Sequence, residues 1–232
     1  MRNTRILRSP KGDIIPYYDV AVLGDTACGK SSIIERLLSG TFTQTYTPTA
    51  AEVYMTTLHE DDKRVACLQL FDTAGGFEFP MMLRLTIKKC QAFFVVYSVG
   101  STKSLETAKK QLEEIVETKG KYVPRVLVGN KSDLDLTKER EISFDMGLQT
   151  AVQYGCAFIE TSAKSDIDIN MSFLSLVKKI DYTASVKRQR FVEEKLKGLQ
   201  HQQPTLKPKR KSSISSVKSF LLNLSSSFSD SE

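Results

Sequence analysis

A glycine-framed loop near the N-terminus has the residue types needed to hold phosphate groups. Glycines let a backbone wrap around phosphate oxygens, and the N–H groups of a helix that begins at Lys30 would point at them. The Lys30 amine supplies positive charge to β- and γ-phosphates, and the Ser31 hydroxyl is placed to bind Mg²⁺. The sequence therefore predicts a nucleotide site, whose phosphate side comprises Gly24, Asp25, Thr26, Ala27, Cys28, Gly29, Lys30, Ser31 and Ser32.

An acidic residue follows a predicted strand further along the chain. Asp72 comes directly after the apolar run Val65–Phe71 and opens an Asp-Thr-Ala-Gly sequence that ends at Gly75. A carboxylate at that strand end would lie beside the phosphate loop, where it can hold Mg²⁺ through a water molecule. The Gly75 amide is placed to reach a terminal phosphate. Alone, this segment would be an ordinary turn; paired with the upstream loop, it predicts the metal side of the site.

Two later motifs indicate which base the site takes. A carboxylate at Asp133 can accept both the N1–H and the exocyclic amine of guanine, whereas adenine would leave it unpaired. A site built on such pairing rejects the wrong ligand by roughly 10⁴–10⁵-fold. We expect the Lys131 stem to lie along the ring plane and the Ala163 amide to reach guanine O6. The predicted base-side residues are Asn130, Lys131, Asp133, Ser162, Ala163 and Lys164.

A mostly parallel sheet is needed to bring these residues together. Runs rich in Val, Phe, Leu and Ile predict strands at Val20–Leu23, Val53–Leu58, Val65–Phe71, Ala92–Val99, Val126–Val128 and Ala157–Ile159. Helices are predicted at Lys30–Ser39, about Phe79–Lys88, Leu105–Glu117, Ser143–Gln153 and Asp168–Val186. The alternation implies an α/β fold with helices on both faces of the sheet and ligands at the carboxyl ends of its strands. The short link His59–Arg64 predicts one antiparallel hairpin.

Composition limits the possible classes of protein. The chain has 232 residues, of which 41% are hydrophobic and 26% charged, as in ordinary soluble domains. No run approaches the roughly 18 apolar residues of a membrane span, and the basic N-terminus lacks the apolar stretch of a secretory signal. Four cysteines without CxxC spacing are typical of reduced thiols. Only His59 and His201 are present, which argues against a histidine-rich metal or triad site.

The charge excess lies entirely in the C-terminal part. Residues 187–232 carry ten Lys or Arg and four Asp or Glu, a net +6 that equals the charge of the whole chain. We expect residues 189–232 to be a tail outside the folded domain, disordered or conditionally helical. A localised basic extension favours an acidic partner. A merely solvated, disordered end is the alternative.

The motifs, taken in order, resemble those of the Ras family of small GTPases over about Tyr17–Arg188. The resemblance implies a P-loop NTPase G domain at residues 17–188 with a six-stranded sheet, after a basic extension at 1–16 and before the tail. It implies a monomeric signalling switch that binds GTP or GDP with Mg²⁺. Its expected partners are protein effectors, which bind two mobile switch segments, together with an exchange factor and an activating protein.

The resemblance also assigns roles that the residues alone do not. It places Phe42 against the base and Tyr46 in the first switch, among the nucleotide-binding residues. It makes Thr49 the residue that reaches both Mg²⁺ and the γ-phosphate, so the implied metal residues are Ser31, Thr49 and, through water, Asp72. Lys30, Thr49 and Gly75 are the expected catalytic positions, with Gly76 beside them.

Two positions depart from the family pattern in ways that bear on catalysis. Gly76 stands where the family has a glutamine that orients the attacking water. Thr26 stands where most members have glycine, and its branched side chain would crowd an arginine supplied by an activating protein. Such an arginine accelerates hydrolysis by about 10³–10⁵-fold. Slow GTP hydrolysis is therefore expected. One alternative is a non-cycling, GTP-bound binding module with negligible hydrolysis. Another is that a residue other than Gly76 positions the water, so that hydrolysis is not slowed.

The tail lacks the prenylated cysteine of typical relatives, but its sequence contains another kind of element that binds membrane surfaces or partner proteins. A basic cluster precedes apolar residues at helical spacing, a pattern that resembles a membrane-surface or calmodulin-target element. The cluster is Lys207, Lys209, Arg210 and Lys211, and the apolar stripe is Ile214, Val217, Leu221, Leu224 and Phe228. Phosphorylation at Ser212 or Ser213 would cancel charge there. We expect a cytoplasmic protein, with peripheral attachment to the inner face of the plasma membrane as one option.

Two other functions are disfavoured by the same residues. A P-loop kinase or ATPase acting on a small molecule does not need the guanine-directed residues Asn130–Asp133 and Ala163. Nucleic-acid binding through the tail would be expected to show interleaved aromatic residues or a recognition helix, and the tail shows neither.

Overall fold

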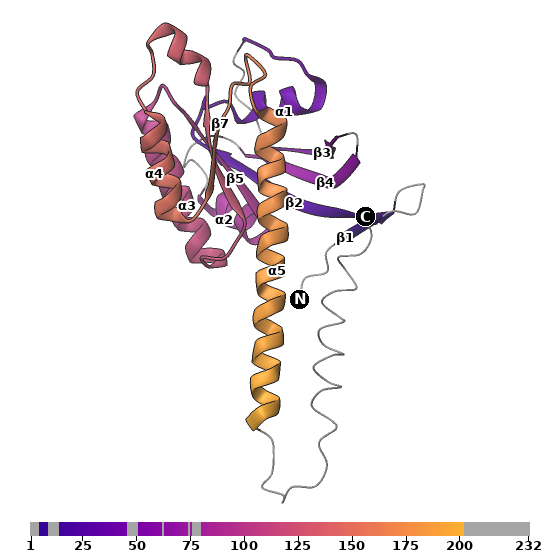
Figure 1. The fold of residues 1–232 in the computed structure, drawn as a ribbon. Helices are drawn as coiled ribbons and strands as arrows, with labels where there is room; N and C mark the ends of the chain where they lie inside the picture. The colour runs from indigo at the N-terminus through magenta and orange to yellow at the C-terminus, as the bar shows by residue number, and fades with distance from the viewer. Residues whose placement is uncertain are drawn as a thin grey trace, which may run out of the picture. The chain divides into compact units, whose positions relative to one another are not determined.

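One sheet organises the computed structural model, which describes residues 5–8, 14–45, 51–61, 63–73, 75 and 80–201 (Figure 1). Its strands run in the order β3-β4-β2-β5-β6-β7, and β1 pairs with β2 off this path. Pairing is parallel from β4 through β7, and antiparallel for β3 with β4 and for β1 with β2. The strands are β1 (Arg5–Arg8), β2 (Ile14–Gly24), β3 (Glu52–Glu60), β4 (Lys63–Asp72), β5 (Ala92–Ser98), β6 (Arg125–Asn130) and β7 (Ala157–Glu160).

The register brings the predicted site segments to one edge of the sheet. Val22 lies opposite Asp72 in the β2–β4 pair, and Gly24 lies opposite Val96 in the β2–β5 pair. Farther along, Ser98 lies opposite Asn130. The carboxyl ends of these parallel strands therefore finish together, which is where open α/β sheets bind ligands.

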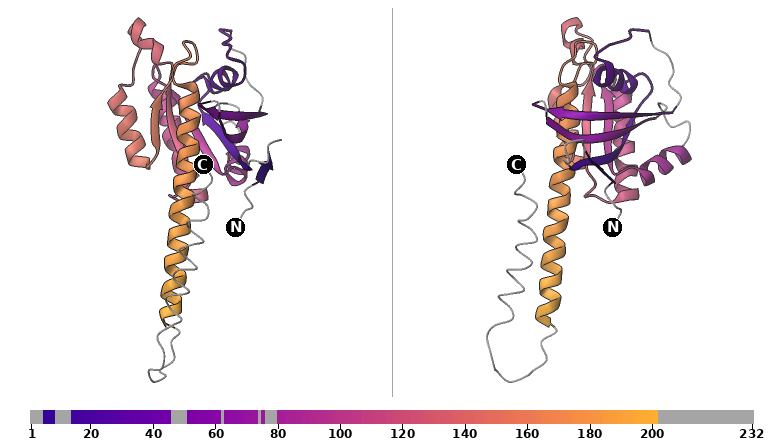
Figure 2. Two further views of the ribbon diagram at one scale, coloured as in Figure 1. Left: turned by 45° about the vertical axis from the view of Figure 1, so that its right-hand side comes forward. Right: turned by 90° about the vertical axis from the view of Figure 1, so that its right-hand side faces the viewer.

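Helices cover both faces of the sheet. Two lie on one face, α1 (Lys30–Ser39) and the first part of α5 (Ile169–His201), and three lie on the other, α2 (Pro80–Lys89), α3 (Thr102–Lys119) and α4 (Phe144–Tyr154). Figure 2 shows α5 and α2 on opposite faces. A 3₁₀ helix, η1 (Ser132–Thr137), follows β6.

The core is built as two layers by the period-two alternation of buried strands. Every residue of β5 is buried, and Phe94 and Val96 pack towards α1 and α5 whereas Phe93 and Val95 pack towards α2 and α3. The Phe94 ring stacks on Phe173 of α5, with centroids 4.3 Å apart. Burial of such apolar side chains is the main force that holds helices to a sheet.

The fold class and the predicted strands and helices are confirmed, and most of their ends differ from the predicted ones by a few residues. The larger differences are β2, which begins at Ile14 and not at Val20, and the end of the last helix. The helix Lys30–Ser39 has the predicted bounds and ends at Gly40, whose φ of 67° is left-handed. The antiparallel hairpin is β3–β4. Strand β1 was not predicted; it lies within the expected basic extension at 1–16.

The last helix is longer than the sequence predicted. It continues through His201, beyond the predicted end at Val186, so the first part of the predicted tail is helical. Glu193, Glu194 and Lys195 are good helix formers, and no proline occurs between Ile169 and Pro204. The chain divides into two compact units after Thr183, inside this helix. Residues 202–232, with the basic cluster and the apolar stripe, lie outside the described residues.

None of the helices in the described ranges is long and apolar enough to cross a membrane.

Candidate nucleotide-binding site

A cavity of about 510 Å³ opens at the carboxyl ends of the parallel strands. Phosphate-side and base-side residues line it together, as predicted from the motifs: Thr26, Ala27, Gly29, Lys30, Ser31, Ser32, Phe42, Gly75, Asn130, Lys131, Asp133, Ala163 and Lys164. Residues without a predicted role also line it: Glu35, Thr43, Gln44, Thr45, Thr73 and Leu134. Tyr46, Thr49 and Gly76 lie outside the described residues, so their predicted roles stay predictions.

The phosphate loop has the backbone that close approach to a ligand requires. Gly24 has φ 151°, and a Cβ there would lie 2.3 Å from the Val96 carbonyl oxygen. Gly29 has φ 98° and precedes α1 with no side-chain cap. The first N–H groups of α1 therefore point out of the helix end without a side-chain acceptor at the cap, which is the arrangement that binds phosphate.

Two side chains of the loop are held in defined positions. The Lys30 amine donates to the Asp25 carbonyl at 2.8 Å, and the Lys30 side chain is buried and lines the cavity. Cys28 is 1% exposed, and burial raises the pKa of its thiol. Cys28 is therefore a neutral packing residue at neutral pH.

The residues predicted to hold magnesium are already arranged around a buried carboxylate. The Ser31 hydroxyl donates to Asp72 Oδ2 at 2.6 Å. Within the described residues, Asp72 Oδ1 is buried without a hydrogen-bond partner. Burial raises the pKa of Asp72, although the Ser31 bond and the Lys30 charge oppose this. A buried acceptor without a partner is costly, so this donor set fits a divalent cation bound through water.

Magnesium here would not rest on a cluster of carboxylates or histidines. In the described ranges, no group of three or more His, Cys, Asp or Glu could hold a metal ion. Hydroxyl, carboxylate, water and phosphate oxygens are the ligands typical of Mg²⁺ in phosphate sites, and Ser31 and Asp72 supply the first two.

Asn130 joins the phosphate side to the base side. Its Nδ2 donates to the Cys28 carbonyl at 3.0 Å. Its Oδ1 accepts from the Thr161 hydroxyl at 3.3 Å and from the Ala163 amide at 3.2 Å. The Asn130 side chain thus fixes the distance between the phosphate loop and the loop after β7. The expected bond from the Ala163 amide to guanine O6 has this competitor, because that N–H already donates to Asn130.

The base side is organised around Asp133. The Ser162 hydroxyl donates to Asp133 Oδ1 at 2.6 Å, and the Ser165 amide donates to the Ser162 oxygen at 3.0 Å. Lys131 sits before η1 in a left-handed conformation, with φ 67°. These contacts orient the Asp133 carboxylate at the cavity wall, where it can accept two parallel N–H bonds from a planar ring.

Arg36 is a residue of this site that the sequence did not single out. It extends from the last turn of α1 and donates to the carbonyls of Ala163 at 2.8 Å and Lys164 at 3.0 Å. Its guanidinium also lies 6.0 Å from the centre of the Phe42 ring. Arg36 therefore holds together two walls of the base side without lining the cavity itself. A basic residue in the last turn of a helix is common, so its position alone gave no signal.

Glu35 fixes the segment after α1. Its carboxylate accepts from the Thr43 hydroxyl at 2.6 Å and from the Thr41 hydroxyl at 3.3 Å. Both threonines lie next to Phe42, which the family resemblance placed against the base.

Thr26 and Gly75 are in close contact. A Cβ at Gly75 would lie 2.4 Å from Thr26 Cα and 2.8 Å from Thr26 Oγ1. The segment after β4 therefore touches the phosphate loop at this point, and any side chain at position 75 would clash there. Thr26 itself is exposed and lines the cavity.

Comparison with known proteins agrees with this geometry. The model of the Ras family matches residues 19–182. The chain belongs to the Ras family. It is 40% identical to the GTP-binding protein drn-1 of Caenorhabditis elegans over 163 residues, which cover 69% of this chain and 74% of that protein. It is 39% identical to the GTP-binding protein Di-Ras2 of Mus musculus over 192 residues, which cover 78% of this chain and 94% of that protein.

The family places the chain among the small GTPases, which bind GTP and GDP. The match spans the whole described sheet from β3 to β7 and the greater part of β2, with the phosphate loop and both base-side motifs.

Proposed function

We propose that this Ras-family protein is a guanine-nucleotide switch that takes up GTP or GDP with Mg²⁺ and hydrolyses GTP slowly. The observation that carries the proposal is the single cavity wall that runs from Lys30 and Ser31 to Asp133. One end supplies cationic and N–H groups for phosphates, and the other supplies a carboxylate for a base. Asn130 connects the two ends through Cys28 and Ala163.

Selection of guanine follows from the fixed carboxylate. Asp133 accepts from the ring N1–H and the exocyclic amine, and Ser162 keeps the carboxylate from turning away. Adenine has an acceptor at N1, so it would leave Asp133 facing a lone pair. Buried polar groups left unpaired in this way reject a ligand strongly.

Ser31 and Asp72 hold the cation, with Thr49 as the further residue expected in the GTP state. When bound, Mg²⁺ neutralises charge on the β- and γ-phosphates. Lys30 adds a positive charge to the same oxygens, and the amide of Gly75 is expected to donate to the terminal phosphate. Loss of that phosphate would remove the ties of Thr49 and Gly75, and this release is the basis of the switch.

Slow hydrolysis rests on two residues. Gly76 has no side chain with which to orient water. Thr26 fills space against Gly75, which is consistent with a cavity wall that leaves little room for an arginine from an activating protein. Both changes act in the same direction, towards a GTP state of long lifetime.

The test is single-turnover hydrolysis by the GTP-loaded full chain. We expect the wild type to be slow, Gly76→Gln to be faster, and Met82→Gln to match the wild type. Met82 is an exposed residue of α2 that does not line the cavity, so Met82→Gln adds a glutamine to the chain without placing it at position 76. A wild-type rate equal to that of an ordinary family member, or a Gly76→Gln rate equal to that of Met82→Gln, would refute slow hydrolysis through Gly76.

The competing function is a non-cycling module in which GTP is a structural cofactor. The nucleotide released when purified protein is denatured separates the two. GTP alone, with no hydrolysis even in Gly76→Gln, would favour the non-cycling module. A mixture of GDP and GTP that shifts towards GDP with time would favour the switch.

The partners and location follow from the switch segments and the tail. The GTP form binds protein effectors, and an exchange factor and an activating protein regulate it. The basic cluster at 207–211 attaches the cytoplasmic protein to anionic membrane, each cation contributing about 1 kcal/mol. Vesicles containing phosphatidylserine should therefore bind the full chain, and changing Lys207, Lys209, Arg210 and Lys211 to Ala should abolish binding. Neutral phosphatidylcholine vesicles are the control, and unchanged binding by the Ala variant would exclude the membrane role and leave calmodulin to be tested.

A further inference from the structure

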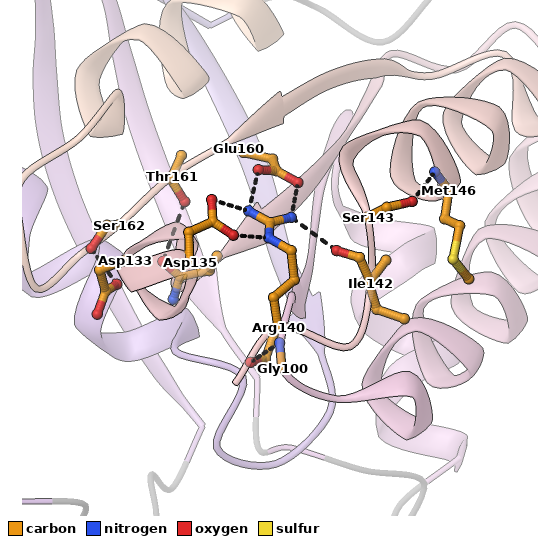
Figure 3. A network of polar contacts seen from close by, with 12 residues as sticks. Gly100, Asp133, Asp135, Arg140, Ile142, Ser143, Met146, Glu160, Thr161 and Ser162 are labelled. Carbon is orange, nitrogen blue, oxygen red and sulfur yellow. Dashed lines mark hydrogen bonds and ion pairs between the residues drawn. The ribbon is translucent and has the colours of Figure 1, made fainter. Parts of the chain in front are cut away.

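Behind the base side of the cavity lies a cluster of charged residues that the proposed function does not use. Arg140 is at its centre, between the carboxylates of Asp135 and Glu160, and we call these three residues the Arg140 cluster (Figure 3). Arg140 Nη1 and Nη2 donate to the two Glu160 oxygens at 2.9 and 2.8 Å. Nε and Nη2 donate to the two Asp135 oxygens, the latter at 3.0 Å.

The guanidinium uses its full donor capacity. Its remaining N–H donates to the Ile142 carbonyl at 2.8 Å, so all five N–H groups have acceptors. The side chains of Arg140 and Glu160 are 17% and 14% exposed, whereas Asp135 is 56% exposed. The Glu160 carboxylate raises the pKa of Arg140, and Asp135 adds to the effect. Bidentate, partly desolvated pairs of this kind are stronger and more directional than surface ion pairs.

The two carboxylates belong to the two segments that hold the base. Asp135 lies in η1, two residues after Asp133. Glu160 ends β7, two residues before Ser162. The same segments meet again at the Asp133–Ser162 bond of 2.6 Å. A bond from the Ser132 amide to the Thr161 carbonyl, at 3.0 Å, also joins them. Arg140 is therefore a further tie between these segments, and no member of the Arg140 cluster lines the cavity.

The loop that carries Asp133 has a strained backbone at both of its ends. Lys131 and Lys138, at its two ends, both have left-handed backbones, with φ 67° and 59°. Non-glycine residues in that region persist when the surrounding structure over-determines them. Without Arg140, the carboxylates of Asp135 and Glu160 would face each other with no cation between them, and their repulsion would push the segments apart.

We propose that Arg140 is a positioning residue for guanine selectivity, because it holds the Asp133 carboxylate in register with Ser162. The inference rests on the proposed function, since it requires Asp133 to read the base. Its effect falls first on the base contacts, because the bonds of the Arg140 side chain go to Asp135, Glu160 and Ile142. The phosphate loop is joined to the base side through Asn130 and is expected to respond less. Small displacements of a directional contact cost far more than small displacements of an apolar one.

Inosine diphosphate isolates the contact in question, because hypoxanthine keeps N1–H and O6 but lacks the exocyclic amine. The experiment measures dissociation constants for GDP, IDP and ADP with Mg²⁺ on the full chain. Arg140→Gln is the test variant. Arg84→Gln is the matched control, because Arg84 also pairs with a glutamate, Glu114 at 2.7 Å, but is 57% exposed on α2.

We expect the preference of the wild type for GDP over IDP to fall at least tenfold in Arg140→Gln and to be unchanged in Arg84→Gln. Glu160→Gln, which keeps the Asp135 pair, should lie between them. A role in general stability would weaken GDP and IDP by the same factor, so an unchanged GDP-to-IDP ratio in Arg140→Gln would overturn the inference. If Arg140→Gln does not fold, Arg140→Lys, which keeps the charge but loses the fork, must show the reduced ratio.

The outcomes separate the two proposals. A wild type that binds ADP as tightly as GDP refutes the proposed function. A wild type that prefers GDP, together with Arg140 variants of unchanged GDP-to-IDP ratio, refutes only the positioning role.

Discussion

Neutralising the carboxylate of Asp72 should make the empty protein more stable and remove its response to magnesium. Asp72 is 1% exposed, and burial raises the pKa of its carboxyl, so the ionised form is less stable in the folded chain than in the unfolded one. A buried polar group left unsatisfied costs about 1–3 kcal/mol, and more when it is charged, so the neutral amide of an asparagine lowers that cost without removing it. The Ser31 bond and the Lys30 charge cancel part of that cost. We therefore expect Asp72→Asn to raise the free energy of unfolding by about 1 kcal/mol at pH 7.

The stability measurement is thermal melting, followed by circular dichroism, of nucleotide-free protein in EDTA. For a domain of this size, about 1 kcal/mol corresponds to roughly 2–4 °C in Tm. Asp181→Asn is the control, because Asp181 is exposed and accepts its bond from Tyr18 at 3.1 Å, which an asparagine oxygen can also accept. A lower Tm for Asp72→Asn would show that the carboxylate is stabilising in the empty site and would refute the electrostatic reasoning.

The second measurement is the affinity for GDP with Mg²⁺ and with EDTA. The wild type should bind GDP much more tightly with Mg²⁺, and Asp72→Asn should bind it with nearly the same, weaker affinity in both buffers. A variant that is stabilised but keeps the full magnesium response would place the cation elsewhere.

Three further changes test other parts of the site. Asp133→Asn should lower the affinity for GDP and raise the affinity for xanthosine diphosphate in a binding titration, because an amide can donate to the 2-oxygen of xanthine. An equal loss of affinity for both nucleotides would contradict direct contact between Asp133 and the base. Arg36→Ala should speed dissociation of a fluorescent GDP analogue at least several-fold by freeing the wall at Phe42, and an unchanged rate would make Arg36 dispensable. Glu141 accepts from the Thr102 amide at 2.7 Å, and this bond lowers the pKa of the Glu141 carboxyl. The stability that the bond gives the folded chain is therefore present above about pH 4.3, the ordinary pKa of a glutamate, and is lost as the pH falls through the lowered pKa. The difference in Tm between the wild type and Glu141→Gln should accordingly become smaller as the pH falls. A difference that grows would contradict the lowered pKa of Glu141.

The phosphate loop could be predicted from sequence because its chemistry is local. Gly24 and Gly29 are needed where the backbone has positive φ, and Lys30 and Ser31 follow at fixed spacing. The base side could be predicted for a similar reason, since Asn130 and the residues after it continue directly from a buried strand.

The ties between segments could not be predicted. Asn130 bonds to the carbonyl of Cys28, 102 residues earlier in the chain, and Arg36 bonds to Ala163, 127 residues later. Arg140 lies in a charged loop that in sequence is typical of a solvated surface. Such contacts depend on which strands become neighbours, and a single sequence shows only local patterns.

Two features of the fold were not predicted, strand β1 and the C-terminal part of α5, and both have local reasons. Strand β1 is short and lies in a basic segment without clear alternation, so only its pairing with β2 defines it. The extension of α5 to His201 was missed because its polar composition was interpreted as tail, although good helix formers predominate and no proline interrupts them.

The most direct test of the account is calorimetric titration of the nucleotide-free full chain with GDP and with ADP, each with Mg²⁺. The account predicts that GDP binds at least about 10⁴-fold more tightly than ADP, the discrimination expected of a site that pairs an oriented carboxylate with two N–H groups of the base. Equal affinities, or binding of GDP that is indifferent to Mg²⁺, would contradict it.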